Sequence, residues 1–104
     1  MVFCHRVYLL TSMIPEGRVS TYGLIAETLA SSPRAVGLSL KRNPDLVRVP
    51  CHRVVESSGG LGGYSAGVEE KRRLLESEGV LVRDNMILDF EKKLYTDFEK
   101  ENKG

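Results

Sequence analysis

The chain contains no tryptophan, only two cysteines and almost no excess charge of either sign. It has 104 residues and a formal net charge of +1 at pH 7. No stretch approaches the roughly 18 apolar residues that a membrane-spanning helix needs. The N-terminus also lacks a signal-peptide pattern, because His5 and Arg6 interrupt its apolar run. We therefore expect an intracellular protein with one modest core, two free thiols rather than a disulfide, and no membrane partner.

Charge is unevenly distributed, and the middle of the chain is basic. Residues 32–53 contain one acid, Asp45, against five cations, which are Arg34, Lys41, Arg42, Arg48 and Arg53. A basic segment within a nearly neutral chain is one sign of an anionic partner. Solvated surface charge is the alternative, and the charge pattern alone does not separate the two.

Apolar spacing predicts three short helices in the first part of the chain. Apolar positions from Phe3 to Ile14 recur at steps of three and four, which is the spacing of one helix face. Ser20 or Thr21 can cap a second helix. Ser31-Ser32-Pro33 is typical of a cap followed by proline at the first position of a third helix, which would end near Arg42. Two short helices in tight succession, the second basic, favour a helix-turn-helix, although such pairs are also common packing units.

The following residues predict an extended segment, a loop, another helix and a hairpin. Residues 46–55 suit a strand or coil, and residues 57–63 form a glycine-rich loop. A charged amphipathic helix is predicted over 68–78, with Gly79 as its C-terminal stop. Residues 80–88 have the pattern of a small hairpin, two apolar triplets around a polar turn.

The last residues differ in composition from the rest. Residues 89–104 form a charged tail in which Phe90, Leu94 and Phe98 are spaced every four residues, a pattern that could form a last helix. The expected fold is mainly α with a small β hairpin, a winged helix-turn-helix-like DNA-binding domain over residues 1–88, followed by this tail.

The tetrapeptide Cys-His-Arg-Val occurs twice and contains every cysteine and histidine of the chain. The copy at Cys4 lies within the first predicted helix, where helix packing explains it. The copy at Cys51 follows Pro50, which places the thiol on a defined extended path before the glycine-rich loop. A nucleophilic thiolate needs a nearby base. His52 is adjacent, but successive side chains of a strand point to opposite faces, so contact would require a bend or a bridging water. On local chemistry a reactive and a buried structural Cys51 both remain open.

Several short motifs occur together in a characteristic order. They are Gly17–Tyr22, Arg34–Gly37, Asn43-Pro44, Pro50–Val54, Gly63–Gly67, and Lys71 followed by Glu78 and Gly79. Together they resemble the O6-alkylguanine-DNA alkyltransferases, which repair DNA by direct reversal, and Pro50–Val54 is similar to the family's active-site signature. The resemblance covers about residues 1–82.

The resemblance implies a catalytic set formed by Cys51, His52, Glu78, Tyr22 and Asn43. Glu78 would orient His52, and His52 would take the Cys51 proton through a water molecule. The thiolate would then attack the alkyl carbon on guanine O6, while Tyr22 would stabilise or protonate the leaving guanine. Asn43 would hold the third helix against the cysteine segment. The resulting thioether is stable, so the protein would react once, with no cofactor and no metal; adjacent Cys-His pairs also fit zinc-ligand spacing poorly.

The resemblance also implies how a monomer would bind double-stranded DNA. Arg34 would enter the base stack from the minor groove as the alkylated guanine flips out of the duplex. The other DNA-binding residues would be Thr21, Ala35, Gly37, Lys41 and Arg42. The substrate pocket would be lined by Pro50, Val54, Tyr64, Ser65 and Ala66. Because Ala66 stands where many family members carry glycine or a bulky residue, the range of accepted alkyl groups stays open.

Two rival functions are compatible with parts of this pattern. A non-catalytic module would bind alkylguanine lesions and recruit other repair factors; alkyltransferase-like proteins act in this way and usually carry tryptophan in place of the reactive cysteine, so Cys51 favours transfer. A general helix-turn-helix protein with a structural cysteine would bind methylated and unmethylated DNA equally. The family usually carries a domain before the matched segment, and we expect it to be absent here. The expected location is the cytoplasm of a prokaryote or the nucleus of a eukaryote.

Overall fold

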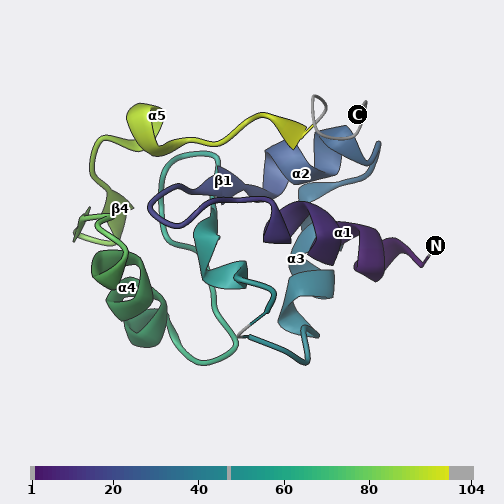
Figure 1. Ribbon diagram of the computed structural model, residues 1–104, viewed down its shortest axis with the longest axis horizontal. Helices are drawn as coiled ribbons and strands as arrows, with labels where there is room; N and C mark the ends of the chain where they lie inside the picture. Colours follow the sequence, from purple (N-terminus) through teal and green to yellow (C-terminus); the bar gives the residue numbers. More distant parts are fainter. Residues whose placement is uncertain (1, 47, 99–104) are drawn as a thin grey trace.

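The computed structural model describes residues 2–46 and 48–98 (Figure 1). Its helices are α1 (Phe3–Ser12), α2 (Tyr22–Thr28), α3 (Pro33–Lys41), α4 (Val68–Ser77) and α5 (Phe90–Lys93), with a short 3-10 turn at Cys51–Arg53. Its strands are β1 (Ser20–Thr21), β2 (Val54–Val55), β3 (Val82–Arg83) and β4 (Met86–Ile87). The described part is therefore mainly helical, as expected for the predicted fold class.

The three N-terminal helices begin where the sequence predicts. The Thr21 hydroxyl accepts a hydrogen bond from the Leu24 N–H at the start of α2. The Ser32 hydroxyl likewise accepts one from the Ala35 N–H at the start of α3, and Pro33 occupies the first helical position. These caps satisfy backbone donors that the first turn of a helix leaves without partners. They fix the tight connection between α2 and α3 that forms the helix-turn-helix.

Two short strands join the N-terminal half of the chain to the cysteine segment. Strand β1 pairs with β2 in parallel, with Ser20 opposite Val54 and Thr21 opposite Val55. Because alternate residues of a strand face opposite sides, Val54 packs in a core with α1, α2 and α3, whereas Val55 packs in a second core beneath α4. This pairing was not predicted, and it places Val54 and Val55, which follow the cysteine turn, between the two cores.

The segment around Cys51 differs from the extended path predicted for residues 46–55. Cys51, His52 and Arg53 form a 3-10 turn, and only Val54 and Val55 are extended. The turn is held by a hydrogen bond from the Arg53 N–H to the Pro50 carbonyl, 2.9 Å long. The alternation of a strand therefore does not govern the directions of the Cys51 and His52 side chains.

The predicted hairpin is present, and its turn has a clear cause. Strands β3 and β4 are antiparallel and are joined by Asp84 and Asn85, both of which have positive φ angles of 52° and 60°. Two consecutive residues in this region form the turn type that matches the twist of a two-residue hairpin, and Asp and Asn tolerate it well. Gly79, with φ +90°, ends α4 as predicted.

The helix that the tail could form is present only at its start among the described residues. Helix α5 ends at Lys93, and Leu94 is extended and bridges Val19. Beyond it, Tyr95 and Phe98 enter the core of α1, α2 and α3, where Phe98 is 1% exposed. Backbone pairing with Val19 thus overrides the four-residue spacing. Residues 99–104 of the tail lie outside the described residues, and the boundary after residue 88 stays a prediction.

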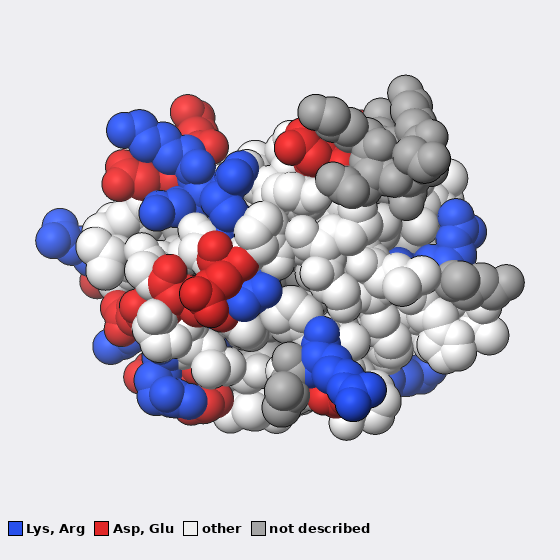
Figure 2. Space-filling model, in the orientation of Figure 1, with Lys and Arg blue, Asp and Glu red and all other residues white. Residues whose placement is uncertain are grey.

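The face shown in Figure 2 is not a continuous basic surface. Charged side chains of both signs gather over α4, the hairpin and α5, whereas the surface over α1 carries few charges. Arg73 and Glu70 form an exposed ion pair within α4. No helix within the described ranges combines the length and apolar character needed to cross a bilayer.

Candidate active site

The Cys51 thiol is buried and is held by an asparagine. Cys51 is 5% exposed, and Asn43 Nδ2 donates to its Sγ across 3.6 Å. Asn43 is itself fixed, because its Nδ2 also donates to the Val49 carbonyl and its Oδ1 accepts from the Asp45 N–H. Burial raises the pKa of the Cys51 thiol, although the hydrogen bond from Asn43 and the charge of Lys71 act in the opposite direction. Asn43 therefore links the end of α3 to the thiol, as the resemblance implies.

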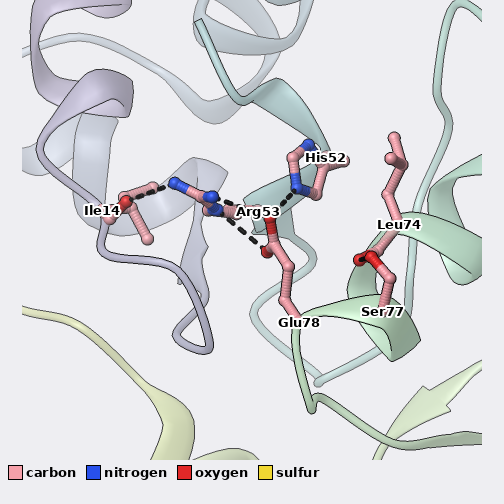
Figure 3. A network of polar contacts seen from close by, with 6 residues as sticks. All are labelled: Ile14, His52, Arg53, Leu74, Ser77 and Glu78. Atoms are coloured by element: carbon pink, nitrogen blue, oxygen red, sulfur yellow. Dashed lines mark hydrogen bonds and ion pairs between the residues drawn. The ribbon is translucent and has the colours of Figure 1, made fainter. Parts of the chain in front are cut away.

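A carboxylate immediately after α4 binds the two residues that follow the cysteine (Figure 3). Glu78 Oε2 lies 3.0 Å from His52 Nε2 and 2.7 Å from Arg53 Nη2, and Arg53 Nε donates to Glu78 Oε1 across 3.0 Å. Arg53 also donates to the Ile14 carbonyl, which ties this network to the end of the first helical segment. Burial of Glu78 raises its pKa, but the hydrogen bonds from Arg53 and His52 outweigh burial and hold the pKa below its usual value.

The hydrogen bond to Glu78 determines which nitrogen of His52 is basic. An ionised carboxylate only accepts hydrogen bonds, so Nε2 carries the hydrogen and Nδ1 has the free lone pair. Nδ1 is buried and has no hydrogen-bond partner among the described residues. Burial lowers the pKa of His52 despite the opposing effect of Glu78, which favours the neutral imidazole that a general base requires.

A fully buried lysine lies against the tyrosine of the predicted catalytic set. Lys71 is 0% exposed, and its Nζ donates to the carbonyls of Val54 and Gly63 and to the Tyr22 hydroxyl, the last across 3.5 Å. Its ammonium group is 5.7 Å from the centre of the Tyr22 ring. Burial lowers the pKa of Lys71 to about 8 and raises that of Tyr22 to about 12. These contacts fix the tyrosine hydroxyl next to a positive charge.

These residues adjoin a cavity of about 770 Å³ between α3 and the glycine-rich loop. Its lining includes Tyr22, Gly23, Pro33, Arg34, Gly37, Leu40, Lys41, Cys51, Glu56, Ser57, Ser58, Gly62, Gly63, Tyr64 and Ser65. The volume lies within the range of small-ligand sites. Gly62 has a φ angle of +70°, and a Cβ atom there would lie 3.3 Å from the Tyr22 ring. Glycine therefore keeps this wall of the cavity open.

The structure brings most of the predicted site residues to this cavity or directly behind it. Cys51, Tyr22, Arg34, Gly37, Lys41, Tyr64 and Ser65 line it. Asn43, His52 and Glu78 lie behind Cys51 in the hydrogen-bonded network. The other five predicted residues do not line the cavity. Pro50 and Val54 are buried, Ala35 is half-buried, and Arg42 and Ala66 are exposed.

The structure gives Thr21 a role other than the predicted contact with DNA. Its side chain is 3% exposed, and its hydroxyl is occupied in capping α2. A buried hydroxyl that already accepts a backbone hydrogen bond has no surface to offer a phosphate group. The contribution of Thr21 to the site is to fix the start of α2, from which Tyr22 reaches the cavity.

Three residues of the site were assigned no role from the sequence. Arg53 was noted only as part of the motif, and Glu56 was not considered. The sequence did not distinguish Lys71 from an ordinary solvent-exposed lysine. A signal for Lys71 was present, because it lies three residues after Val68 and four before the buried Leu75, on the inward face of α4. A lysine on the apolar face of a helix requires buried hydrogen-bond acceptors. No local pattern identified the partners of Arg53.

Lys71 gives the stability of the protein a defined pH dependence. Its pKa falls from 10.5 to about 8 on folding, so between these values the unfolded chain binds more protons at this side chain and the free energy of unfolding rises with pH. From about pH 7.5 to about pH 9.5 we expect the wild type to gain about 2 kcal/mol relative to Lys71→Met. Denaturant unfolding of both proteins across this range measures the difference. Parallel pH profiles would contradict the burial of a titrating lysine.

Comparison with known proteins identifies relatives of this chain. Residues 2–80 match the family model described as 6-O-methylguanine DNA methyltransferase, DNA binding domain. The chain is 54% identical over 81 residues to the methylated-DNA–protein-cysteine methyltransferase of Metallosphaera sedula, and 54% identical over 78 residues to that of Sulfolobus acidocaldarius. These matches cover 78% and 75% of this chain but 51% and 50% of the relatives. The chain thus spans about half the length of the curated relatives it matches.

Solved structures share the fold of the chain. The O6-methylguanine-DNA methyltransferase of Pyrococcus kodakaraensis is 53% identical with a TM-score of 0.71, over 77% of this chain and 47% of that protein. OGT of Mycobacterium tuberculosis in complex with DNA is 44% identical with a TM-score of 0.71, over 75% and 50% of the two chains. Atl1 of S. pombe, in complex with damaged DNA that contains O6-carboxymethylguanine, is 33% identical with a TM-score of 0.80, over 89% of this chain and 94% of that protein. Together with the family match over residues 2–80, these relatives show that the chain belongs to the family of the 6-O-methylguanine DNA methyltransferase DNA-binding domain.

Proposed function

We propose that this protein repairs duplex DNA by moving an alkyl group from guanine O6 to its own Cys51, once per molecule. The observation that carries the proposal is a thiol in the wall of a cavity of about 770 Å³, with His52 and Glu78 directly behind it. A nucleophile, a base and a residue that orients the base are the parts that covalent catalysis requires. A structural cysteine would need neither the cavity nor the network.

The reaction uses the groups of the site in a simple sequence. The Cys51 proton passes through a water molecule to His52 Nδ1, and Glu78 stabilises the imidazolium that forms. A bond then forms between Sγ and the alkyl carbon as the bond from that carbon to O6 breaks, and the electron pair stays on guanine. Tyr22 donates a proton to the guanine anion. Because the pKa of Tyr22 is about 12, the adjacent Lys71 ammonium assists by stabilising the tyrosinate.

Helix α3 supplies the contacts with DNA in this proposal. Arg34 and Lys41 line the cavity from this helix, and Gly37 between them carries no side chain that would prevent close approach of the duplex. We place α3 in the minor groove, with Arg34 in the space left by the flipped guanine and Lys41 close to the phosphates. The OGT protein of M. tuberculosis was solved with DNA, which supports a DNA-binding role for this fold. The proposed site residues lie around one cavity of a single chain, which supports action as a monomer.

Arg34→Ala tests the insertion of this side chain into the duplex. Flipping a base costs a few kcal/mol in lost stacking, and a side chain that fills the gap recovers part of that cost. We expect the variant to repair an alkylated duplex about tenfold to thirtyfold more slowly, with an unchanged rate on the free O6-alkylguanine base. Single-turnover kinetics on both substrates measures this. Arg48→Ala removes an exposed cation outside the cavity lining and serves as the matched control; equal losses in the two variants would contradict insertion.

The proposed activity predicts a particular change in the DNA. After incubation with excess protein, a duplex that carried O6-methylguanine should contain guanine at that position, as measured by nucleoside analysis. With excess duplex, the amount repaired should stop at one lesion per protein molecule. Continued turnover beyond this limit, or an unchanged lesion, would contradict single transfer to Cys51.

A second candidate function is lesion binding without chemistry. The match to Atl1 of S. pombe favours it, because that protein was solved in complex with damaged DNA containing O6-carboxymethylguanine. A module of this kind would bind O6-alkylguanine in DNA and recruit other repair factors. The reactive arrangement around Cys51 supports transfer instead. Tight binding of an alkylated duplex, without removal of the alkyl group from the DNA, would support the binding module.

A further inference from the structure

The cavity contains an acid that the proposed mechanism does not use. Among the side chains that line it, Arg34 and Lys41 carry positive charge and Glu56 alone carries negative charge. Glu56 follows β2 directly and thus lies on the segment that also positions Cys51. A carboxylate in a cavity that would receive part of a polyanion is unfavourable for binding in general, so its presence calls for a specific role.

The position of Glu56 is fixed by its own backbone and by two glycines. Its N–H donates to the Gly60 carbonyl and its carbonyl accepts from the Gly59 N–H, each across 2.9 Å. A Cβ atom at Gly60 would lie 2.7 Å from Glu56 Oε1, and a Cβ atom at Gly62 would lie 3.2 Å from Glu56 Cγ and 3.4 Å from the Tyr22 hydroxyl oxygen. The side chain of Glu56 therefore lies over the glycine-rich loop, with Oε1 against Gly60 and Cγ against Gly62, and Gly62 also adjoins Tyr22.

The charge of this carboxylate is not cancelled by a direct partner. No described cation forms an ion pair with Glu56, and its side chain accepts no hydrogen bond from the described residues. Its electrostatic effect reaches the site. The Glu56 charge adds to the effect of burial, which raises the pKa of Tyr22, and it opposes the effect of burial, which lowers the pKa of Lys71. An anionic substituent in the cavity would be repelled by the Glu56 carboxylate, and this repulsion would weaken its binding.

We propose that Glu56 sets the charge selectivity of the cavity, so that neutral or positively charged O6-alkyl groups are transferred faster than those carrying a negative charge. This inference rests on the proposed transfer to Cys51. It assigns a substrate class, guanines whose O6 substituent has no anionic group. Repulsion between the carboxylate and an anionic substituent acts in both the bound and transition states, and it slows transfer from that substituent alone.

The test compares two substituents that have nearly the same shape and different charge. Duplexes would carry O6-carboxymethylguanine, which is anionic, or O6-carbamoylmethylguanine, its neutral amide, and a third duplex with O6-methylguanine reports that transfer occurs at all. The quantity measured is the ratio of the second-order rate constants for the amide and the acid, obtained by single-turnover kinetics in wild type and in Glu56→Gln. Glu76→Gln, which removes an exposed acid of α4 outside the cavity lining, is the matched control.

Glu56→Gln should reduce the ratio of amide to acid by roughly five- to tenfold, the effect of one unit charge at about 8 Å in a partly hydrated site. Glu76→Gln should leave the ratio unchanged, and added salt should lower the wild-type ratio because the carboxylate is exposed. An unchanged ratio in Glu56→Gln, with methyl transfer intact, would overturn the inference and leave the proposed function standing. A uniform change on all three duplexes would also overturn it, since it would mean that Glu56 contacts the guanine base. Absence of methyl transfer in the wild type would instead reject the proposed function.

Discussion

Cys51→Ser is expected to remove alkyl transfer while preserving the affinity for alkylated DNA. The thiol is the nucleophile in the proposed sequence, and a serine hydroxyl is a far weaker nucleophile than a thiolate at neutral pH. Because serine is slightly smaller and can accept the hydrogen bond that Asn43 donates to Sγ, the cavity should keep its shape. We expect the rate of transfer to fall at least about a thousandfold, measured by quenching single turnovers on a duplex with O6-methylguanine.

Cys4→Ser provides the matched control for this substitution. Cys4 is a half-buried residue of α1, outside the cavity lining, and the structure has both cysteines as free thiols. This variant should transfer the methyl group at the wild-type rate. Loss of transfer in Cys4→Ser, or its persistence in Cys51→Ser, would show that the nucleophile had been misassigned.

Glu78→Gln is expected to damage stability and transfer together. The carboxylate is the shared partner of His52 and Arg53, whose side chains are 7% and 15% exposed. Replacing it by an amide leaves the Arg53 guanidinium without an opposite charge. The amide NH2 group is also a hydrogen-bond donor, so it cannot accept from the guanidinium as the carboxylate oxygen does. Breaking one side of a buried ion pair in this way costs about 3 kcal/mol in the free energy of unfolding. Denaturant unfolding measures this loss.

The effect on transfer arises from the orientation of His52. With a carboxylate as partner, Nε2 keeps its hydrogen and Nδ1 stays basic, but an amide can also donate and so permits the wrong tautomer. Loss of the orienting carboxylate should slow transfer by about a hundredfold to a thousandfold. Glu76→Gln, an exposed substitution in the last turn of α4, should change neither property. A Glu78→Gln protein that transfers at the wild-type rate would contradict the role of His52 as base.

Local sequence patterns predicted the helical framework because its determinants are local. Hydroxyl side chains at Thr21 and Ser32 begin α2 and α3, and Gly79 ends α4. The hairpin followed from a polar turn between two apolar triplets. Each of these features depends on residues within four positions of one another, so a single sequence is enough to identify it.

The parts that failed depend on contacts between distant segments. The pairing of β1 with β2 joins residues 34 positions apart, as Ser20 and Val54 show. The bridge from Val19 to Leu94 ends α5 early, whereas the spacing of the tail favoured a longer helix. Tertiary pairing overrides local preference in both cases.

The candidate site was identified in the sequence through a family resemblance rather than through local chemistry. The motif around Cys51 was ambiguous by itself, because a strand would have separated the cysteine from its base. The 3-10 turn and the contact of Glu78 with His52 give that motif a physical basis. The hydrogen-bond partners of Lys71 and the position of Glu56 became visible only in the fold. Lys71 binds Tyr22 and Gly63, and Glu56 packs against Gly60 and Gly62, contacts that no local pattern shows.

Intact-protein mass spectrometry after mixing with a duplex carrying one O6-methylguanine tests the central claim most directly. Peptide mapping would locate any added group, and an undamaged duplex of the same sequence would serve as the control. The proposed function predicts one methyl group on Cys51, none on Cys4, and no change with the control duplex. Binding of the methylated duplex with an unchanged protein mass would contradict it and would identify the chain as a lesion-binding module.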